Sequence, residues 1–376
     1  MQHKVTPTEL ALFSRSPVIG AWWEQLNKID PNRAPKPEAD VLDQLLFESG
    51  HKHEQLLIKD LKNNGKKVKQ LSGKMTAESF EETLNAVHDG KYDFIHQASL
   101  QNNELRGSAD LLERIDMPSK LGNWSYIPIE CKLSSHPKPI YLVQACAYCE
   151  LLEPILGYLP ENFKLYLGGR KFEKEPYGYC LDDFWMWYKS LRDRYKKFIE
   201  NFDESNQPEY SPGDHGHWSS FVEEELKKKR DLILVAGMRR NQRNKLISSG
   251  ICTIDELAKA SRSQIKNQMD EKIFVQLKEQ AAIQICPAQS DGRPAFQIRD
   301  KDEQEKGLLM LPKSDEGDIW FDMEGYPNPI TGKKLEYLFG ACFLSKKEQT
   351  LERKFNAWWA HDPEQEKKLL MNLLIG

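Results

Sequence analysis

Hydrophobic positions along the chain alternate between a helical and an extended spacing. Apolar residues recur every three or four positions from Val41 to Leu61 and again over residues 139–156, which predicts a long helix in each place. Between these helices lie short runs that are rich in apolar and β-branched residues and are bounded by polar turns, as strands are. We therefore expect an α/β fold, with strands at residues 92–100, 105–115 and 125–134.

Beyond residue 200 the pattern is mainly helical, and it ends in two expected strands. Residues 203–217, a polar segment with two prolines and two glycines, form the first linker candidate. Helical periodicity continues to about residue 285, and a second loop-like stretch leads to the strands. The sequence therefore predicts three domains, at residues 1–205, 218–286 and 315–376.

Composition restricts the class of protein. With 376 residues and 39% hydrophobic content, the chain can bury substantial cores. Its formal net charge of -4 excludes a uniform cationic field, so any grip on nucleic acid must be local. The seven cysteines, none of them before Cys131, favour a reducing compartment over a disulfide framework. We expect a cytoplasmic protein with no membrane partner, because no signal peptide or run of ~20 apolar residues is present.

The main candidate site combines two acidic residues and a lysine. Glu130 and Lys132 are two apart on an expected strand and so share one face, and Asp110 closes the G-S-A-D segment within the preceding strand. Clustered carboxylates are costly to desolvate unless a cation lies between them, and all-oxygen ligation suits Mg²⁺ or Mn²⁺. Taken alone, an E-x-K triplet is more often a surface ladder on an edge strand. The surrounding order of elements is what changes that interpretation.

This order resembles the RecB-like branch of the PD-(D/E)XK nucleases, which includes CRISPR-associated exonucleases. A helix with a histidine is followed by a hairpin with G-x-x-D, a strand with E-x-K and a helix with Q-x-x-x-Y. The resemblance is close over residues 40–170 and loose over 1–200. It implies a restriction-endonuclease-like core that hydrolyses DNA phosphodiester bonds with a metal, at DNA ends or in single strands.

The resemblance also implies roles for individual residues. Asp110, Glu130 and Lys132 would be catalytic, and Gln144 and Tyr148 would help to place the DNA. His51 competes with His53 for the role of metal ligand, and the G-x-x-H-E spacing favours His53. The implied ligands of Mg²⁺ or Mn²⁺ are His53, Asp110, Glu130 and the backbone carbonyl of Cys131.

Many relatives in this branch hold an iron-sulfur cluster with one cysteine before the nuclease core and three after it. Here the first place offers Ser16, and the second, near residues 211–221, offers His215 and His217. An iron-sulfur cluster is therefore not expected. Cys146 and Cys149 form a C-x-x-C within an expected helix, which without a second pair is a weak zinc signal.

A turn at Gly250 separates a basic helix from one with capping-box spacing at Thr253 and Glu256. This arrangement resembles a helix-hairpin-helix module, although a small helical packing domain is equally compatible with it. As DNA-contacting residues of the module we expect Arg239, Arg240 and Arg243.

Near the end of the chain, Asp322 and Glu324 lie two apart on an expected strand. They resemble the first motif of RNase H-like DEDD exonucleases, which needs further carboxylates from later elements to hold two metals. Beyond Trp358 and Trp359 the only late acids are Asp362, Glu364 and Glu366, in an expected helix. We therefore expect a partial, β-rich RNase H-like segment with an incomplete second site.

The sequence thus predicts a metal-dependent DNA nuclease, with a helicase as a candidate partner. One alternative is a catalytically weak, nuclease-like module that binds or recruits DNA. Another is an RNA-cleaving defence nuclease, because recognition of the 2′-hydroxyl cannot be deduced from these motifs.

Overall fold

The computed structural model describes most of the chain, and these residues form two compact units. The first unit comprises Met1–Pro7, Ala39–Tyr188 and Glu303–Gly376, and the second comprises Thr8–Glu38 and Lys189–Asp302. The grouping differs from the three expected domains, because Thr8–Glu38 joins the later helices. The described residues are 4–35, 41–168, 176–265, 268–287, 292–297, 310–327, 334–347 and 350–375.

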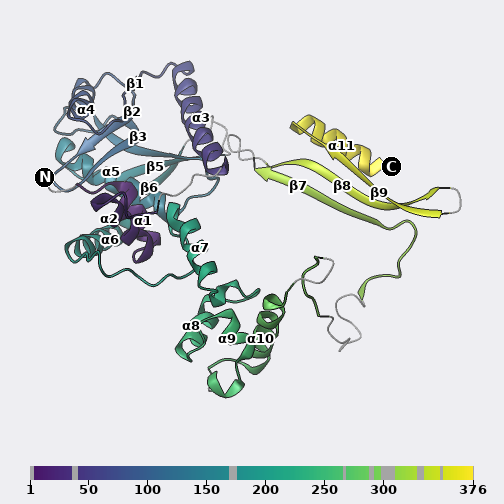
Figure 1. The fold of residues 1–376 in the computed structure, drawn as a ribbon. Coiled ribbons are helices and arrows are strands. Elements are labelled where there is room, and N and C mark those ends of the chain that lie inside the picture. The colour runs from purple at the N-terminus through teal and green to yellow at the C-terminus, as the bar shows by residue number, and fades with distance from the viewer. Residues whose placement is uncertain are drawn as a thin grey trace. The chain divides into compact units, whose positions relative to one another are not determined.

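A six-stranded mixed sheet forms the centre of the first unit (Figure 1). Its strands follow one another in sequence order, and β1–β2 and β4–β5 are the two parallel pairs. The mixed α/β class expected from the sequence is confirmed. The strands are β1 (Val68–Gln70), β2 (Phe94–Gln101), β3 (Arg106–Ile115), β4 (Ser125–Lys132), β5 (Asn162–Leu167) and β6 (Tyr177–Cys180).

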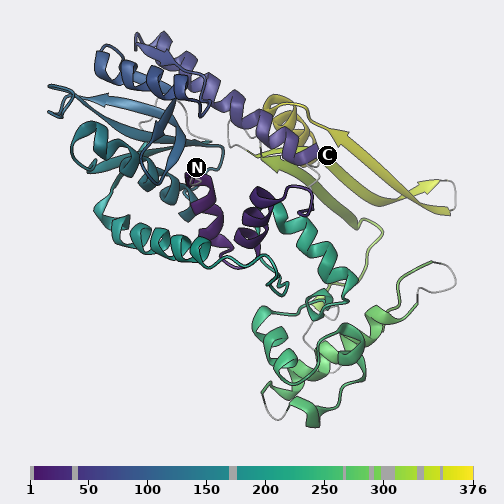
Figure 2. The same ribbon diagram turned by 60° about the vertical axis from the view of Figure 1, so that its left-hand side comes forward.

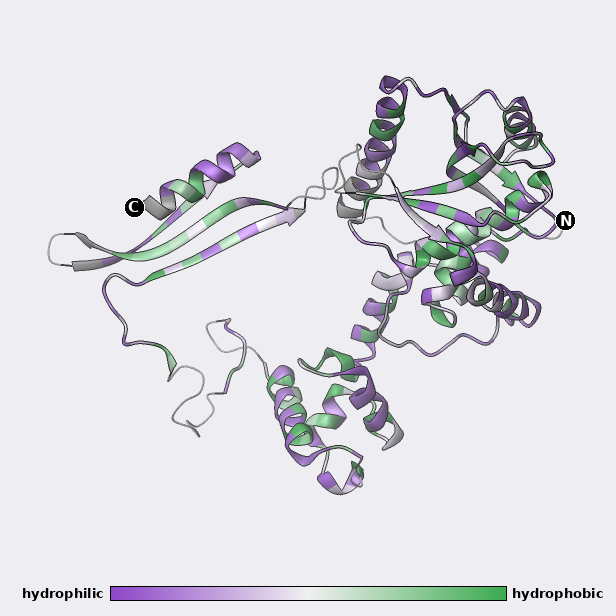
Figure 3. Cartoon of the chain, turned by 180° about the vertical axis from the view of Figure 1, so that it is seen from behind, coloured by the Kyte–Doolittle hydropathy of each residue, from purple (hydrophilic) through white to green (hydrophobic). Residues whose placement is uncertain are grey.

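Three helices accompany this sheet, namely α3 (Val41–Asn63), α4 (Ala77–Asp89) and α5 (Pro139–Leu156). The side chains of Leu57 and Ile58 on α3 pack on the sheet residues Phe94, Leu111, Ile129 and Tyr166. Figure 3 shows hydrophobic residues along the strands of this sheet. Burial of this apolar surface, at about 25 cal/mol per Å², fixes which face of α3 turns toward the sheet.

The sheet forks between β3 and β4. These strands pair antiparallel from Ile115↔Ser125 to Leu111↔Ile129, and the described pairing ends there. Asp110 and Glu130, the next residues along each strand, are therefore not held in a ladder pair. Side chains at such an opening can bind backbone groups or a ligand that a continuous ladder would exclude.

The second unit is helical and has two apolar cores. One core gathers Trp22, Trp23 and Trp218, and the other gathers residues of the later helices, including Leu246 and Phe274. Helix α6 spans the boundary between the units. The helices are α1 (Pro7–Arg15), α2 (Ile19–Ile29), α6 (Asp182–Glu200), α7 (Ser219–Lys228), α8 (Arg240–Ser248), α9 (Ile254–Lys259) and α10 (Glu271–Ile285), with 3-10 turns η1 (Gly216–Trp218), η2 (Leu232–Leu234) and η3 (Arg262–Ile265).

The last part of the chain forms a separate three-stranded antiparallel sheet with a helix along it (Figure 2). Phe339 and Ala341 of its central strand are buried. Trp320, Phe355 and Trp359 are exposed. Its elements are β7 (Ile319–Pro327), β8 (Lys334–Lys347), β9 (Thr350–Trp359) and α11 (Pro363–Ile375).

The pattern of the sequence predicted most of these elements, but not all. Strands β2 to β4, helices α3 and α5 and the helical region after residue 218 are confirmed. Short or edge elements were missed, namely α2, β1, β6 and β9. The linker candidate at residues 203–217 is not a free linker, because Tyr210 and His215 within it are buried. In the described part of the chain, no helix is long and apolar enough to cross a membrane.

Candidate active site

The fork in the first sheet brings together the three side chains that the sequence selected. The Lys132 Nζ lies 2.5 Å from Glu130 Oε2 and 3.6 Å from Asp110 Oδ2. Glu130 and Lys132 are two residues apart on β4, so both point to the same side of the strand. One ammonium group is thus shared by two carboxylates from neighbouring strands.

Asp110 is held by the backbone of the opposite strand. Its Oδ2 accepts a hydrogen bond of 2.8 Å from the N–H of Cys131. The β3–β4 pairing ends at Leu111↔Ile129, so this N–H has no backbone carbonyl of β3 as its partner. The Asp110 side chain accepts its hydrogen bond instead. The bond orients the Asp110 carboxylate toward β4 and leaves its other oxygen for a ligand.

Burial dominates the electrostatics of this cluster. Glu130 is only 1% exposed, and burial together with the nearby Asp110 raises the pKa of its carboxyl to about 7. Burial also raises the pKa of Asp110, although Lys132 opposes this effect. For Lys132, burial disfavours the charge, but the two carboxylates outweigh it and raise the pKa of the ammonium. A site with more carboxylates than cations in a dry environment favours an added positive charge.

His53 lies on the same pocket, on helix α3. Its ring stacks on that of Tyr166, with centroids 5.4 Å apart and planes inclined by 25°. Burial lowers the pKa of His53, which favours the neutral imidazole that metals bind. The pocket has a volume of about 210 Å³ and is lined by Gly50, His51, His53, Glu54, Asp110, Cys131, Lys132 and Leu133.

Glu54 is a site residue to which the sequence analysis gave no role. Its Oε1 accepts hydrogen bonds from His96 Nε2 at 2.7 Å and from Gln97 Nε2 at 2.6 Å. Burial opposes ionisation of this carboxyl, but the two hydrogen bonds together with the charge interactions of His96 and His51 outweigh burial and lower the pKa of Glu54. The only signal in the sequence was its position beside His53.

These donors fit a divalent cation bound mainly through oxygen. Asp110, Glu130 and Glu54 supply carboxylates, and His53 supplies a neutral nitrogen, a combination that Mg²⁺ or Mn²⁺ accepts. Across residues that the structure describes, no group of three such side chains is already arranged to hold a metal ion. Binding by both Asp110 and Glu130 would require the Lys132 ammonium to give up part of its contact with them.

The two residues expected to place DNA from helix α5 have different settings. Gln144 is partly exposed. Tyr148 is buried, and its hydroxyl donates a 2.7 Å hydrogen bond to the carbonyl of Ser108. Tyr148 therefore ties α5 to β3, and its hydroxyl is not presented to a substrate.

The three arginines expected to contact DNA from the helical module also differ in their exposure to solvent. Arg239 and Arg240 are exposed at the start of α8. Arg243 is 8% exposed and forms a two-point ion pair with Asp231, at 2.7 Å from Nε to Oδ1 and 2.5 Å from Nη2 to Oδ2. The expectation that Arg243 contacts DNA is corrected, because its guanidinium is already used inside the protein. The capping box of Thr253 and Glu256 is confirmed.

Ser16 and His215, the residues compared above with the cluster cysteines of RecB-like nucleases, lie together in the second unit. The Ser16 Oγ is 2.7 Å from His215 Nδ1 and also accepts a 2.6 Å hydrogen bond from the N–H of Gly20. His217 pairs with Glu24 at 3.1 Å. The thiols of Cys146 and Cys149 are free and buried, so their environment is that of core residues.

The acidic pair on β7 is not part of a larger cluster in the described residues. Asp322 and Glu324 stand opposite Gly340 and Leu338 and are exposed. Asp362 instead accepts hydrogen bonds from the backbone at the start of α11, and Glu366 accepts one from the N–H of Glu336. The late acids therefore satisfy backbone donors of their own segment.

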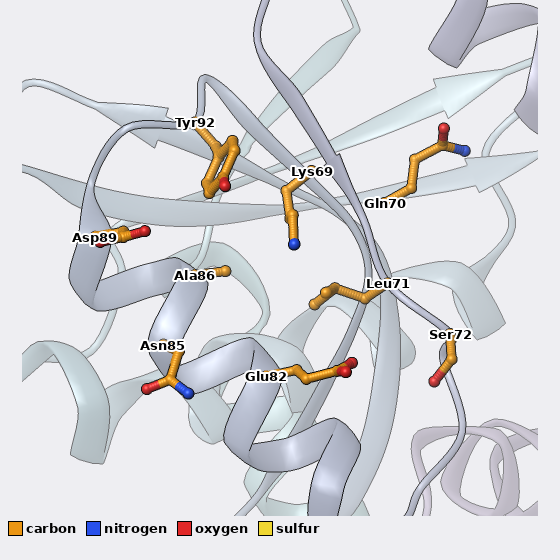
Figure 4. A pocket seen from close by; sticks show the side chains of 9 residues that line it. All are labelled: Lys69, Gln70, Leu71, Ser72, Glu82, Asn85, Ala86, Asp89 and Tyr92. Atoms are coloured by element: carbon orange, nitrogen blue, oxygen red, sulfur yellow. The ribbon is translucent and has the colours of Figure 1, made fainter.

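A second pocket of about 280 Å³ lies between β1 and α4 (Figure 4). Lys69 and Tyr92 face one another across it, with the Lys69 Nζ 5.9 Å from the ring centroid. The acidic residues Glu82 and Asp89 on its α4 side are exposed. Water screens these exposed charges, so their carboxylates are not desolvated. In this respect the pocket differs from the one at Asp110.

Comparison with known proteins does not assign a family. No family model matches the chain, and no curated protein is significantly similar to it. The geometry of the pocket at Asp110 and the chemistry of its side chains are therefore the basis for a functional hypothesis.

Proposed function

We propose that the chain is a metal-dependent nuclease of the RecB-like PD-(D/E)XK type. Its substrate would be DNA, cleaved by phosphodiester hydrolysis in single strands or at ends. One observation carries the proposal: Asp110, Glu130 and Lys132 converge at the fork of the sheet, beside a pocket lined by His53. Two carboxylates and an ammonium in this arrangement suit the chemistry of phosphodiester hydrolysis.

The cofactor would be Mg²⁺ or Mn²⁺. Asp110, Glu130, His53 and the carbonyl of Cys131 would hold it. When bound, such an ion polarises the scissile phosphate and lowers the pKa of a coordinated water. The buried carboxylates favour the ion because it offsets the burial and the repulsion by Asp110 that together raise the pKa of Glu130 to about 7.

Side chains of the protein would orient the metal ligands, stabilise the transition state and contact the DNA. The Cys131 N–H fixes Asp110, so this carboxylate is oriented before substrate arrives. Lys132, displaced from the carboxylates, would point its ammonium at the charge that develops on the phosphate. The partly exposed Gln144 and the exposed Arg239 and Arg240 are candidates for contacts to the DNA, through phosphates in the case of the arginines.

The test is cleavage of labelled single- and double-stranded DNA and RNA in Mg²⁺ or Mn²⁺. Lys132→Ala should lower turnover at least about 100-fold, as loss of one stabilising group for the transition state does. Lys164→Ala is the matched control, because Lys164 also lies on a strand of this sheet and pairs with a glutamate, Glu113, at 2.6 Å. Full activity of Lys132→Ala, or an equal loss in Lys164→Ala, would refute the assignment.

A nuclease-like module that binds DNA without cleaving it is the second candidate. It is favoured by the contact of Lys132 with both carboxylates, which offsets part of their charge without a metal. Binding of DNA with no turnover in either cation would select this function. Cleavage of RNA but not of DNA would select the defence nuclease.

A further inference from the structure

The two oxygens of the Glu54 carboxylate differ in their hydrogen bonds. Both of its hydrogen bonds, from His96 and Gln97, go to the same oxygen, Oε1. Among the described residues, Oε2 receives no hydrogen bond. Glu54 also lines the pocket with Asp110 and Lys132, and its side chain is 12% exposed. Because both bonds go to Oε1, Oε2 is the oxygen of this carboxylate that is left for a ligand in the pocket.

The backbone at Gln97 is shaped to make this contact. Gln97 is one of two non-glycine residues with positive φ in the described chain, at 55°. In the β2–β3 register His96 pairs with Leu111 and Ala98 with Ala109, so Gln97 stands opposite Asp110 without pairing to it. Such a conformation costs about 1 kcal/mol or more and is retained where the surroundings or the function require it.

Neighbouring groups fix the Gln97 amide. The Ser108 hydroxyl donates to Gln97 Oε1 at 3.2 Å, which turns the Nε2 toward Glu54. A Cβ on Gly73 would lie 2.5 Å from the same Oε1, so a glycine at this position leaves room for the amide. Strand β2, the turn at Gly73 and strand β3 therefore cooperate to place one oxygen of one helical glutamate.

We propose that Glu54 is a further carboxylate of the cation site and that His96 and Gln97 are its positioning residues. This inference rests on the proposed function and extends it. With Glu54 included, three carboxylates face one ammonium, a formal charge of two negative units that one divalent cation balances. Because Mg²⁺ keeps much of its water shell, Glu54 Oε2 is suited to accept a hydrogen bond from a bound water.

Binding of Mn²⁺ to the full chain, measured by its paramagnetic resonance signal and by calorimetry, tests this inference. Glu54→Gln preserves an oxygen for both donors and replaces the pocket-facing oxygen by an amide. We expect about tenfold weaker Mn²⁺ binding, within the range for loss of a supporting partner at a metal site. Glu48→Gln, the same change at an exposed position of α3, should bind as the wild type does.

The positioning residues need a measurement that a structural role alone would not change. Gln97→Gly removes the amide but suits the positive φ, so Mn²⁺ affinity should fall several-fold while thermal stability holds or rises. His96→Ala should weaken binding, and His96→Gln, which restores an N–H donor, should recover part of it.

The outcomes separate this inference from the proposed function. Absence of Mn²⁺ binding by the wild type would overturn the proposed function, and this inference with it. If Asp110→Asn abolishes binding while Glu54→Gln stays within twofold of the wild type, the proposed function stands and Glu54 is excluded from the site. Unchanged Mn²⁺ affinity in Gln97→Gly would likewise overturn the positioning role.

Discussion

Replacing Glu130 by glutamine should stabilise the first unit at high pH even though it should abolish function. Glu130 is 1% exposed, and burial with the neighbouring Asp110 raises the pKa of its carboxyl to about 7 from 4.5. Above neutral pH and without a cation, the ionised Glu130 carboxylate is desolvated in the native protein, which lowers the free energy of unfolding. Glutamine has nearly the same shape and removes that charge.

The sign and size follow from proton linkage. Below pH 4.5 the carboxyl is protonated in both states, and as the pH rises the unfolded chain loses its proton first. Because the native state then binds more protons, the free energy of unfolding falls between pH 4.5 and about 7 and is constant above. At about 1.4 kcal/mol for each pH unit between the two pKa values, the loss reaches about 3 kcal/mol.

The assay is urea unfolding in a chelator at pH 5 and pH 8, followed by hydrogen exchange of peptides from β3 and β4. Wild type should lose more stability between these values than Glu130→Gln, in which only Asp110 of this pair keeps a raised pKa, and added Mn²⁺ should reverse their order at pH 8. Glu113→Gln is the control, since Glu113 lies on β3 and pairs with Lys164 but is about a fifth exposed. A variant less stable than wild type by more than about 1 kcal/mol at pH 8, in chelator, would refute the reasoning.

Two further predictions concern the helical unit. Arg243→Ala should destabilise it by about 3–5 kcal/mol in urea unfolding, because Asp231 would remain as an unpaired buried charge. Arg239→Ala should leave the stability unchanged and reduce the salt slope of DNA binding by about one. Equal behaviour of the two variants would contradict the burial argument. Ser16→Ala should cost about 1–3 kcal/mol in thermal or urea unfolding, because the Gly20 N–H and His215 Nδ1 would lose their partner, and an unchanged midpoint would show that water replaces the hydroxyl.

Periodicity predicted the interior of the fold better than its edges. Helix α3 and strand β4 each carry a long apolar pattern, because one or both faces are buried, and such patterns survive as signals in the sequence. Strand β1 has only three residues and β6 has four, too few for a period to emerge. Residues 203–217 have the composition of a linker, yet His215 there is buried through its bond to Ser16, a contact between positions 199 residues apart.

The candidate site was predictable where chemistry depends on spacing along one strand. Glu130 and Lys132 could be placed on one face by counting, and the structure gathers Asp110 with them. The role of Arg243 could not be read in the same way, because an exposed and a buried arginine at the start of a helix have the same sequence signature. Burial against Asp231 decides which of the two it is.

The fork of the sheet is the feature from which the site derives its properties. If β3 and β4 paired one residue further, the Cys131 N–H would bond to the backbone of β3 and Asp110 would lose its donor. The interruption at Gln97 acts on the other side of Asp110, where β2 leaves the ladder to bond Glu54. Regular strand pairing is thus interrupted on both sides of Asp110. The interruption at Cys131 orients the carboxylate of Asp110, and the one at Gln97 orients the carboxylate of Glu54. Regular pairing can be lost twice around one residue only if other contacts offset the cost, and here those contacts converge on the pocket of Lys132.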